Sequence, residues 1–170
     1  MGRIVAVFAI TAIVGGALAQ SVVVDITGVE SRDEQGNPIN VVLGVDLGIP
    51  NAEVTGIAWD LLYTPRSPSW TNEPHMTYGD TGGSNAYDWD MGNWGGVNNS
   101  TPISLVGSDS TSFFVGGDGI LQIEFWEDFV DFAGAADGIY GSSLTIRFVP
   151  EPSSLALLGL VGLVAARRRR

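Results

Sequence analysis

Short segments in which apolar and polar side chains alternate recur along most of this chain. Successive side chains of a β-strand point to opposite faces, so a period of two predicts half-buried strands. Only residues 127–136 hint at one or two helical turns. We therefore expect an all-β protein of about seven strands. The alternation is clearest in residues 22–26, 41–47, 57–63, 113–115, 121–125 and 144–148.

Glycine and proline separate these segments, with 23 glycines and eight prolines in 170 residues. Such punctuation of short strands favours an antiparallel β-sandwich, jelly-roll-like or galactose-binding-like, and leaves a barrel as the alternative. The charged stretch 30–40 contains Gly36-Asn37-Pro38 and predicts a turn, which could join the first two strands as a hairpin. The chain has no cysteine, so its stability must come from packing or from bound ions.

The first 19 residues have the three parts of a secretory signal peptide. Arg3 gives a positive start, residues 4–14 are apolar, and Ala17-Leu18-Ala19 is a small-x-small cleavage site. Signal peptidase is expected to cut after Ala19 and to leave Gln20 as the new N-terminus. One folded domain, residues 20–148, is then predicted outside the cytoplasm.

The last 22 residues, 149–170, form a segment of different composition. Pro150 and Pro152 disfavour regular structure around Glu151, so an extended and exposed turn is expected there. Residues 153–166 are apolar and uncharged, and at about 1.5 Å per residue they make a helix of about 20 Å, short of a bilayer core of about 30 Å. A short transmembrane helix is expected, with the arginines that follow it on the cytoplasmic side. These are Arg167, Arg168, Arg169 and Arg170.

This tail resembles the PEP-CTERM sorting signal, the substrate of exosortase in Gram-negative bacteria that make exopolysaccharide. The resemblance rests on the motif Val149, Pro150, Glu151 and Pro152, the apolar run and the basic end, which are adjacent and in order. It implies a precursor tethered in the inner membrane, recognition and cleavage by exosortase, and release to the cell surface or extracellular matrix. The alternative is an ordinary membrane anchor that is never cleaved.

The expected mature domain is strongly acidic. Between Gln20 and Val149 there are 18 acidic residues and three arginines, a net charge of −15, and the chain has no lysine. Such a surface repels nucleic acid and favours cations. Calcium is the one cofactor considered, because it takes oxygen ligands from acidic, glycine-containing loops. The candidate ligands are Asp80, Asp88 and Asp90, although their spacing does not fit an EF-hand; a purely solubilising acidic surface is the alternative.

The sequence favours no catalytic residues, and we expect the protein not to be an enzyme. His75 is the one histidine, there is no Gly-x-Ser-x-Gly elbow, and neighbouring acids such as Asp88 and Asp90 are expected by chance in so acidic a chain.

The aromatic residues between positions 64 and 102 give one further hypothesis. Tyr87, Trp89 and Trp94 lie close to acidic residues and could stack on sugar rings, or could instead pack the loop onto the sandwich. The sequence therefore predicts a non-catalytic exported surface or matrix protein associated with exopolysaccharide and biofilm. The alternative is a carbohydrate- or calcium-binding surface module.

Overall fold

The structure is a computed structural model, and it describes residues 19–150. The predicted signal peptide, apart from Ala19, lies outside the described residues, as do Glu151, Pro152, the apolar run and the four arginines. The domain consists of nine strands and one turn of 3₁₀ helix. They are β1 (Gln20–Asp25), β2 (Glu30–Ser31), β3 (Val41–Asp46), β4 (Glu53–Pro65), β5 (Pro74–Asp80), β6 (Asn85–Asp90), η1 (Met91–Trp94), β7 (Ile103–Phe114), β8 (Ile120–Glu127) and β9 (Gly138–Val149).

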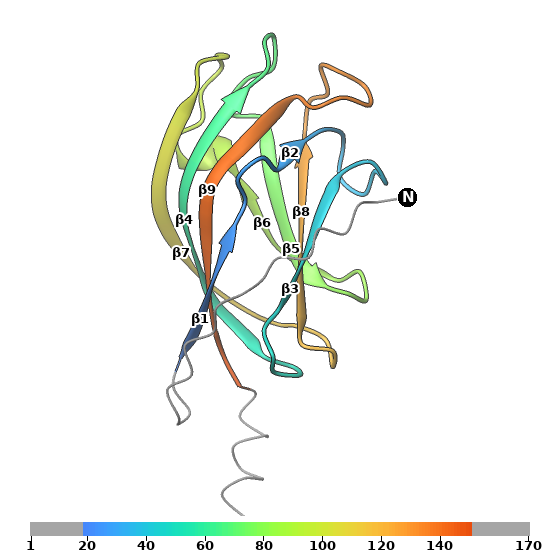
Figure 1. The fold of residues 1–170 in the computed structure, drawn as a ribbon, viewed down its shortest axis with the longest axis vertical. Coiled ribbons are helices and arrows are strands. Elements are labelled where there is room, and N and C mark those ends of the chain that lie inside the picture. Colours follow the sequence, from blue (N-terminus) through green and yellow to red (C-terminus); the bar gives the residue numbers. More distant parts are fainter. Residues whose placement is uncertain (1–18, 151–170) are drawn as a thin grey trace, which may run out of the picture.

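The strands form two antiparallel sheets that face each other (Figure 1). One sheet has the order β1-β9-β4-β7, with the short β2 beside β9, and the other has the order β3-β8-β5-β6. Apart from β2, each sheet thus has four strands, and the chain crosses between the sheets in the order of a jelly roll. The prediction of an all-β fold with antiparallel sheets is confirmed.

The core lies between the two sheets and is built from the inward side chains of alternating strands. Because every second residue points inward, each strand except the short β2 contributes between one and five buried apolar side chains. Large aromatic rings fill much of this space: Trp59 packs edge-on against Trp89 at 5.5 Å, and Tyr63 and Phe125 both contact Tyr140 at 4.9 and 5.1 Å between ring centroids. With no disulfide, this packing holds the two sheets together.

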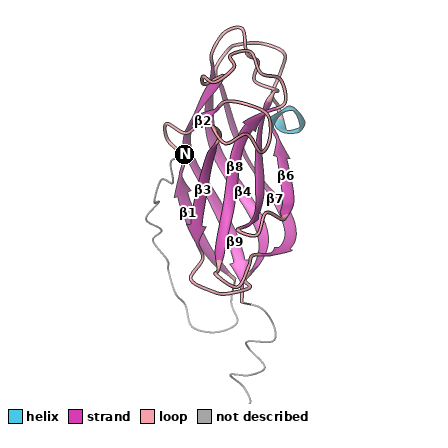
Figure 2. Cartoon of the chain, turned by 90° about the vertical axis from the view of Figure 1, so that its right-hand side faces the viewer, coloured by secondary structure: helices cyan, strands magenta, loops and turns pink. Residues whose placement is uncertain are grey.

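The connecting loops gather at the two ends of the sandwich (Figure 2). Residues 26–40, 66–73, 91–102 and 128–137 lie at one end, which we call the apical end. Residues 47–52, 81–84 and 115–119 lie at the other, the basal end. Gln20 begins β1 opposite Phe148 near the end of β9, so both ends of the described domain lie at the basal end.

Three expectations about local structure were wrong. β1 and β3 do not form a hairpin, because β1 pairs with β9 and β3 with β8, in different sheets. Residues 128–137 form bends and turns rather than helix, and Asp137 accepts two of their backbone N–H groups. The segment between residues 64 and 102, whose sequence suggests a loop, contains β5 and β6.

Candidate functional site

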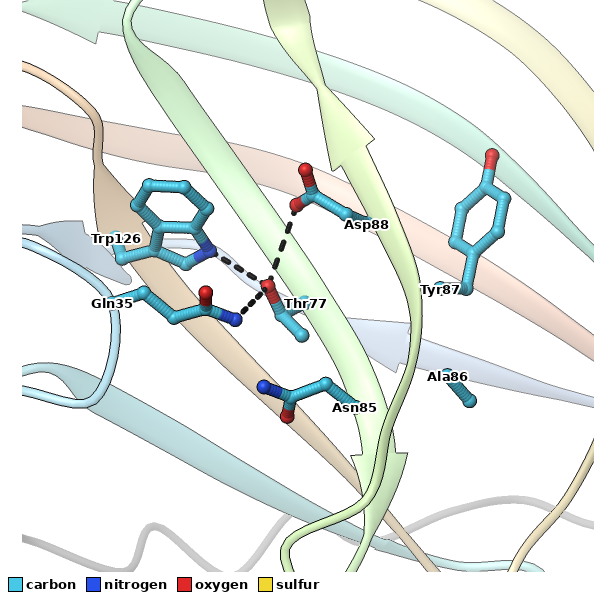
Figure 3. Close-up of a pocket in the computed structure, with 7 residues that line it drawn as sticks. All are labelled: Gln35, Thr77, Asn85, Ala86, Tyr87, Asp88 and Trp126. Carbon is cyan, nitrogen blue, oxygen red and sulfur yellow. Dashed lines mark hydrogen bonds between the residues drawn. The ribbon is translucent and has the colours of Figure 1, made fainter.

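A hollow of about 340 Å³ opens on the outer face of the four-stranded sheet. It lies over β5, β6 and β8, and the loop before β3 forms one wall (Figure 3). On these strands the outward positions alternate with core residues, so polar side chains stand together on the outside. The residues that line the hollow are Gln35, Thr77, Asn85, Ala86, Tyr87, Asp88 and Trp126.

Thr77 connects the side chains at the floor of this hollow. Its hydroxyl oxygen accepts hydrogen bonds from Trp126 Nε1 at 2.8 Å and from Gln35 Nε2 at 3.0 Å, and its O–H lies 3.4 Å from Asp88 Oδ1. Figure 3 shows these groups converging on Thr77. Because one buried hydroxyl orients side chains from three segments, the floor is fixed before any ligand arrives.

Glu124 fixes the wall that carries Gln35. One oxygen, Glu124 Oε1, accepts hydrogen bonds from the backbone N–H of Gly36 at 2.7 Å and from Asn40 Nδ2 at 2.8 Å. Asn40 is buried and also donates to the Glu34 carbonyl, so it closes the turn that the sequence predicts there. The loop is therefore held against β8 by side-chain bonds rather than by strand pairing.

His75 extends the polar face from the hollow toward the apical end. Its ring stacks on Trp126 with 4.1 Å between centroids, and Nδ1 lies 3.2 Å from Asp88 Oδ2. Nε2 lies 3.8 Å from Asp90 and 3.9 Å from Asp128. Burial lowers the pKa of His75, but the hydrogen bond that the imidazole donates to Asp88 and the three carboxylate charges outweigh it and raise the pKa above its usual value.

The free polar groups of the hollow are amide and carboxylate groups. The Asn85 side chain is exposed and is not hydrogen-bonded to the other residues that line the hollow (Figure 3). Asp88 keeps acceptor capacity beyond its contacts with His75 and Thr77, and Trp126 is only partly buried. Amide, carboxylate and indole groups in a shallow cavity can bind a hydroxyl-rich, uncharged ligand.

The three aromatic residues predicted to stack on sugars lie in different surroundings. Trp89 is wholly buried, so the structure corrects its assignment to a sugar-stacking surface. Tyr87 points away from the centre of the hollow (Figure 3), and its hydroxyl donates to Asp109 Oδ2 at 2.6 Å. Trp94, in η1, is 38% exposed and packs on Trp59 with 4.6 Å between centroids. Trp89 and Tyr87 thus pack within the domain. Trp94 also packs against the domain, but it remains partly exposed.

The structure separates one candidate calcium ligand, Asp80, from the other two, Asp88 and Asp90, which both lie beside His75. Asp80 Oδ1 accepts the Ser84 N–H at 2.9 Å in the β5–β6 turn, at the basal end. Asp90 Oδ1 accepts the Gly92 N–H at 2.7 Å and caps η1, at the apical end of β6. Within residues 19–150 no group of three or more histidine, aspartate or glutamate side chains is arranged to hold a metal ion.

A buried carboxyl group lies between the sheets near the apical end. Glu127 is 0% exposed, and its Oε1 accepts a hydrogen bond from the Tyr63 hydroxyl at 2.8 Å, which is itself 3.0 Å from Ser31 Oγ. Glu127 Oε2 and the Tyr140 hydroxyl have no partner among the described residues. Burial raises the pKa of Glu127 to about 8, so this carboxyl group is mostly protonated at neutral pH.

The last core strand continues directly into the tail. Phe148 is 1% exposed and Val149 still pairs with Glu53 of β4, whereas Pro150 has no N–H with which to extend the ladder. No helix among residues 19–150 is long and apolar enough to cross a membrane. The described chain is thus a two-sheet β-domain whose final strand is followed at once by a Pro-Glu-Pro sequence.

The comparisons with known proteins agree with this division. The family model of the PEP-CTERM protein-sorting motif matches residues 148–170, at the C-terminus. No curated protein and no solved structure matches the chain significantly. The motif implies an exported protein that is processed by exosortase.

Trp126 and Gln35 were not among the predicted site residues. The signal for Trp126 was present, because Gln122 and Glu124 are the polar positions of an alternating strand and Trp126 continues their parity. No comparable signal exists for Gln35, because its place depends on a loop that folds back over another strand.

Proposed function

We propose that this chain is a non-catalytic protein of the cell surface or extracellular matrix of a Gram-negative-type bacterium, associated with exopolysaccharide and biofilm. The observation that supports this most is the sorting motif, which begins inside β9. A cut in the Pro-Glu-Pro region leaves every strand intact, because Val149 is the last residue of the ladder. Before the cut, the apolar run tethers the precursor in the inner membrane.

The basal position of Val149, the last residue of β9, determines how the domain would be displayed. Gln20 and Val149 lie at the same end, so attachment through the new C-terminus leaves the apical loops free. The net charge of −15 between Gln20 and Val149 keeps the released domain soluble and away from anionic membranes.

The test follows the protein in cells with and without exosortase. With the enzyme, intact-mass measurement of surface-extracted protein should show a chain that starts at Gln20 and lacks the arginines from Arg167 onward. Without it, the uncleaved chain should stay with the inner membrane. Equal surface delivery in both strains, or a surface form that still ends at Arg170, would contradict the proposal.

The hollow supports a second candidate, a carbohydrate-binding module. Its free groups, the Asn85 amide and the Asp88 carboxylate, are those that hydrogen-bond to sugar hydroxyls, and the partly buried Trp126 offers an apolar surface beside them. The acidic domain favours a neutral polysaccharide over a uronic or sulfated one. Calcium binding has no comparable support, because no group of three or more histidine, aspartate or glutamate side chains in the described domain is arranged to hold a metal ion.

Affinity electrophoresis in gels that contain neutral or acidic polysaccharides separates these alternatives. Asn85→Ala should weaken retention by a neutral polysaccharide several-fold without changing the melting temperature, because Asn85 is exposed and not hydrogen-bonded to the other residues of the hollow. Phe129→Ala, which truncates a 61% exposed ring in an apical loop, is the matched control and should bind normally. A processed protein that no neutral polysaccharide retains would remove this candidate and leave the sorting proposal untouched.

A further inference from the structure

The four sheet edges of this sandwich are not alike. β1, β3 and β6 are edge strands of six residues each. β7, the remaining edge, has 12 residues and lies outermost in its sheet (Figure 1). Native proteins usually keep edge strands short or protect them with lysine, proline or a bulge, because an open edge pairs with other chains. β7 is the edge whose length calls for an explanation.

β7 also has few of the features that prevent pairing. Asp109 is its one charged side chain, and its carboxylate is occupied by the Tyr87 hydroxyl. The strand contains no proline or lysine, and it is regular from Ile103 to Ser110, before the register shift with β4. On its outer face Val106 is 82% exposed, more than any other large apolar side chain described. The edge is therefore open over eight residues.

We propose that β7 pairs with β7 of a second copy of this chain, antiparallel, about a two-fold axis at Val106. In this register Val106 lies opposite its own copy, Ser104 opposite Ser108, and Asp109 opposite Ile103, so no like charges face each other. The two sheets become one continuous sheet of β1-β9-β4-β7 followed by the same strands in reverse order. A two-fold axis at Asp109 would instead place two aspartates side by side.

We assign a second copy to this edge because, in this register, the one charged residue of β7 faces an isoleucine and not its own copy. An isologous pairing of this kind uses both β7 edges and closes, so it gives a dimer and not a fibre. The other three edge strands are not expected to add further copies to this dimer, because each is half as long as β7 and ends in an aspartate. These aspartates are Asp25, Asp46 and Asp90. The inference is independent of the hollow and of the sorting proposal.

The charge of the domain gives the pairing a distinctive salt dependence. Each copy carries a net charge of −15 between Gln20 and Val149, so the two repel each other when salt is low. At physiological ionic strength the Debye length falls to about 8 Å, and this repulsion is largely screened. Self-association should therefore strengthen with salt, whereas binding to a basic partner would weaken.

Sedimentation velocity of the processed protein, at low and at physiological salt, tests the proposal. We expect a monomer–dimer equilibrium that shifts toward dimer as salt rises. Val106→Lys should weaken the dimer by at least about tenfold, because two like charges then meet at the axis. Val23→Lys is the matched control, since Val23 is an exposed valine on the edge strand β1, and it should leave the dimer unchanged.

A cysteine variant tests the register itself. The natural chain has no cysteine, so Val106→Cys introduces a single thiol, and directly opposed strand residues have Cα atoms about 4.5–5.5 Å apart, within disulfide range. Oxidation should give a disulfide-linked dimer for Val106→Cys and little for Val23→Cys. A protein that remains monomeric at both salt concentrations, or that dimerises equally well with Val106→Lys, overturns the proposal. Efficient cross-linking of Val23→Cys alone would do the same, by placing the contact at β1.

Discussion

Replacing Glu127 by glutamine should change how the stability of this domain depends on pH. Glu127 is fully buried without a cationic partner, and burial raises its pKa from 4.5 to about 8. The folded state therefore keeps the proton over an interval in which the unfolded chain has lost it. The stability contributed by that proton is complete below about pH 4.5 and is lost as pH rises toward 8.

The magnitude follows from this interval. One pH unit corresponds to about 1.4 kcal/mol, so the interval from 4.5 to about 8 amounts to about 5 kcal/mol at most. This is large against the total stability of about 5–15 kcal/mol of an ordinary domain. Wild-type protein should therefore lose stability between pH 5 and pH 8. The raised pKa values of Glu73 and Asp137, also caused first by burial, act in the same direction and leave a smaller slope when Glu127 is absent.

Urea denaturation of the processed protein at several pH values between 5 and 8 measures this slope. Glu127→Gln keeps an acceptor for the Tyr63 hydroxyl and cannot ionise, so its free energy of unfolding should fall much less with pH than that of wild type. Glu124→Gln, on the outer face of the same strand, is the control and should retain the slope because Glu127 is still present. A Glu127→Gln slope as steep as that of wild type would refute the assignment of the buried proton.

Two further perturbations follow from contacts in the core and on the outer face. Gly138→Ala should destabilise the domain by several kcal/mol in the same urea assay, because a Cβ there would lie 2.0 Å from the Tyr63 hydroxyl, whereas Gly117→Ala meets nothing within 4 Å and should be near neutral. Equal effects of the two substitutions would contradict the packing. Wild-type protein should gain stability as pH falls through the raised pKa of His75, and His75→Gln should lose this gain. NMR titration of the imidazole should show a pKa above the usual value for histidine. Asp88→Asn should lower the pKa of His75.

The fold class follows from the sequence because alternation is a local property. Val22 and Val24 of β1, for example, point into the core of the domain, as their alternation with polar residues predicts. In a strand, every second side chain points to the same face. β6 shows the same parity, since Tyr87 and Trp89 point inward and Asp88 outward. The many glycine and asparagine residues on either side of β6 suggest a loop, so the sequence does not reveal this six-residue strand.

The pairing of strands and the composition of the hollow could not be predicted in the same way. β9 pairs with β1 and β4, which are far from it in sequence, and alternation gives no information about which strands become neighbours. The hollow brings Gln35, Thr77, Asp88 and Trp126 together from four segments. Each residue is polar or amphipathic for its own local reason, and their common site exists only after the jelly-roll order is set.

Trp126 and Glu127 are neighbours in β8 whose side chains lie on opposite faces of the four-stranded sheet. They are consecutive in β8, so Trp126 stacks on His75 outside the sheet while Glu127 bonds to Tyr63 of the opposite sheet inside. Both titrating groups, His75 and Glu127, favour the folded state in their protonated forms. Acidification also lowers the net negative charge, and with it the self-repulsion of the domain. The domain should therefore be more stable near pH 5 than near pH 8, in contrast to the acid sensitivity expected where carboxylates are paired with cations.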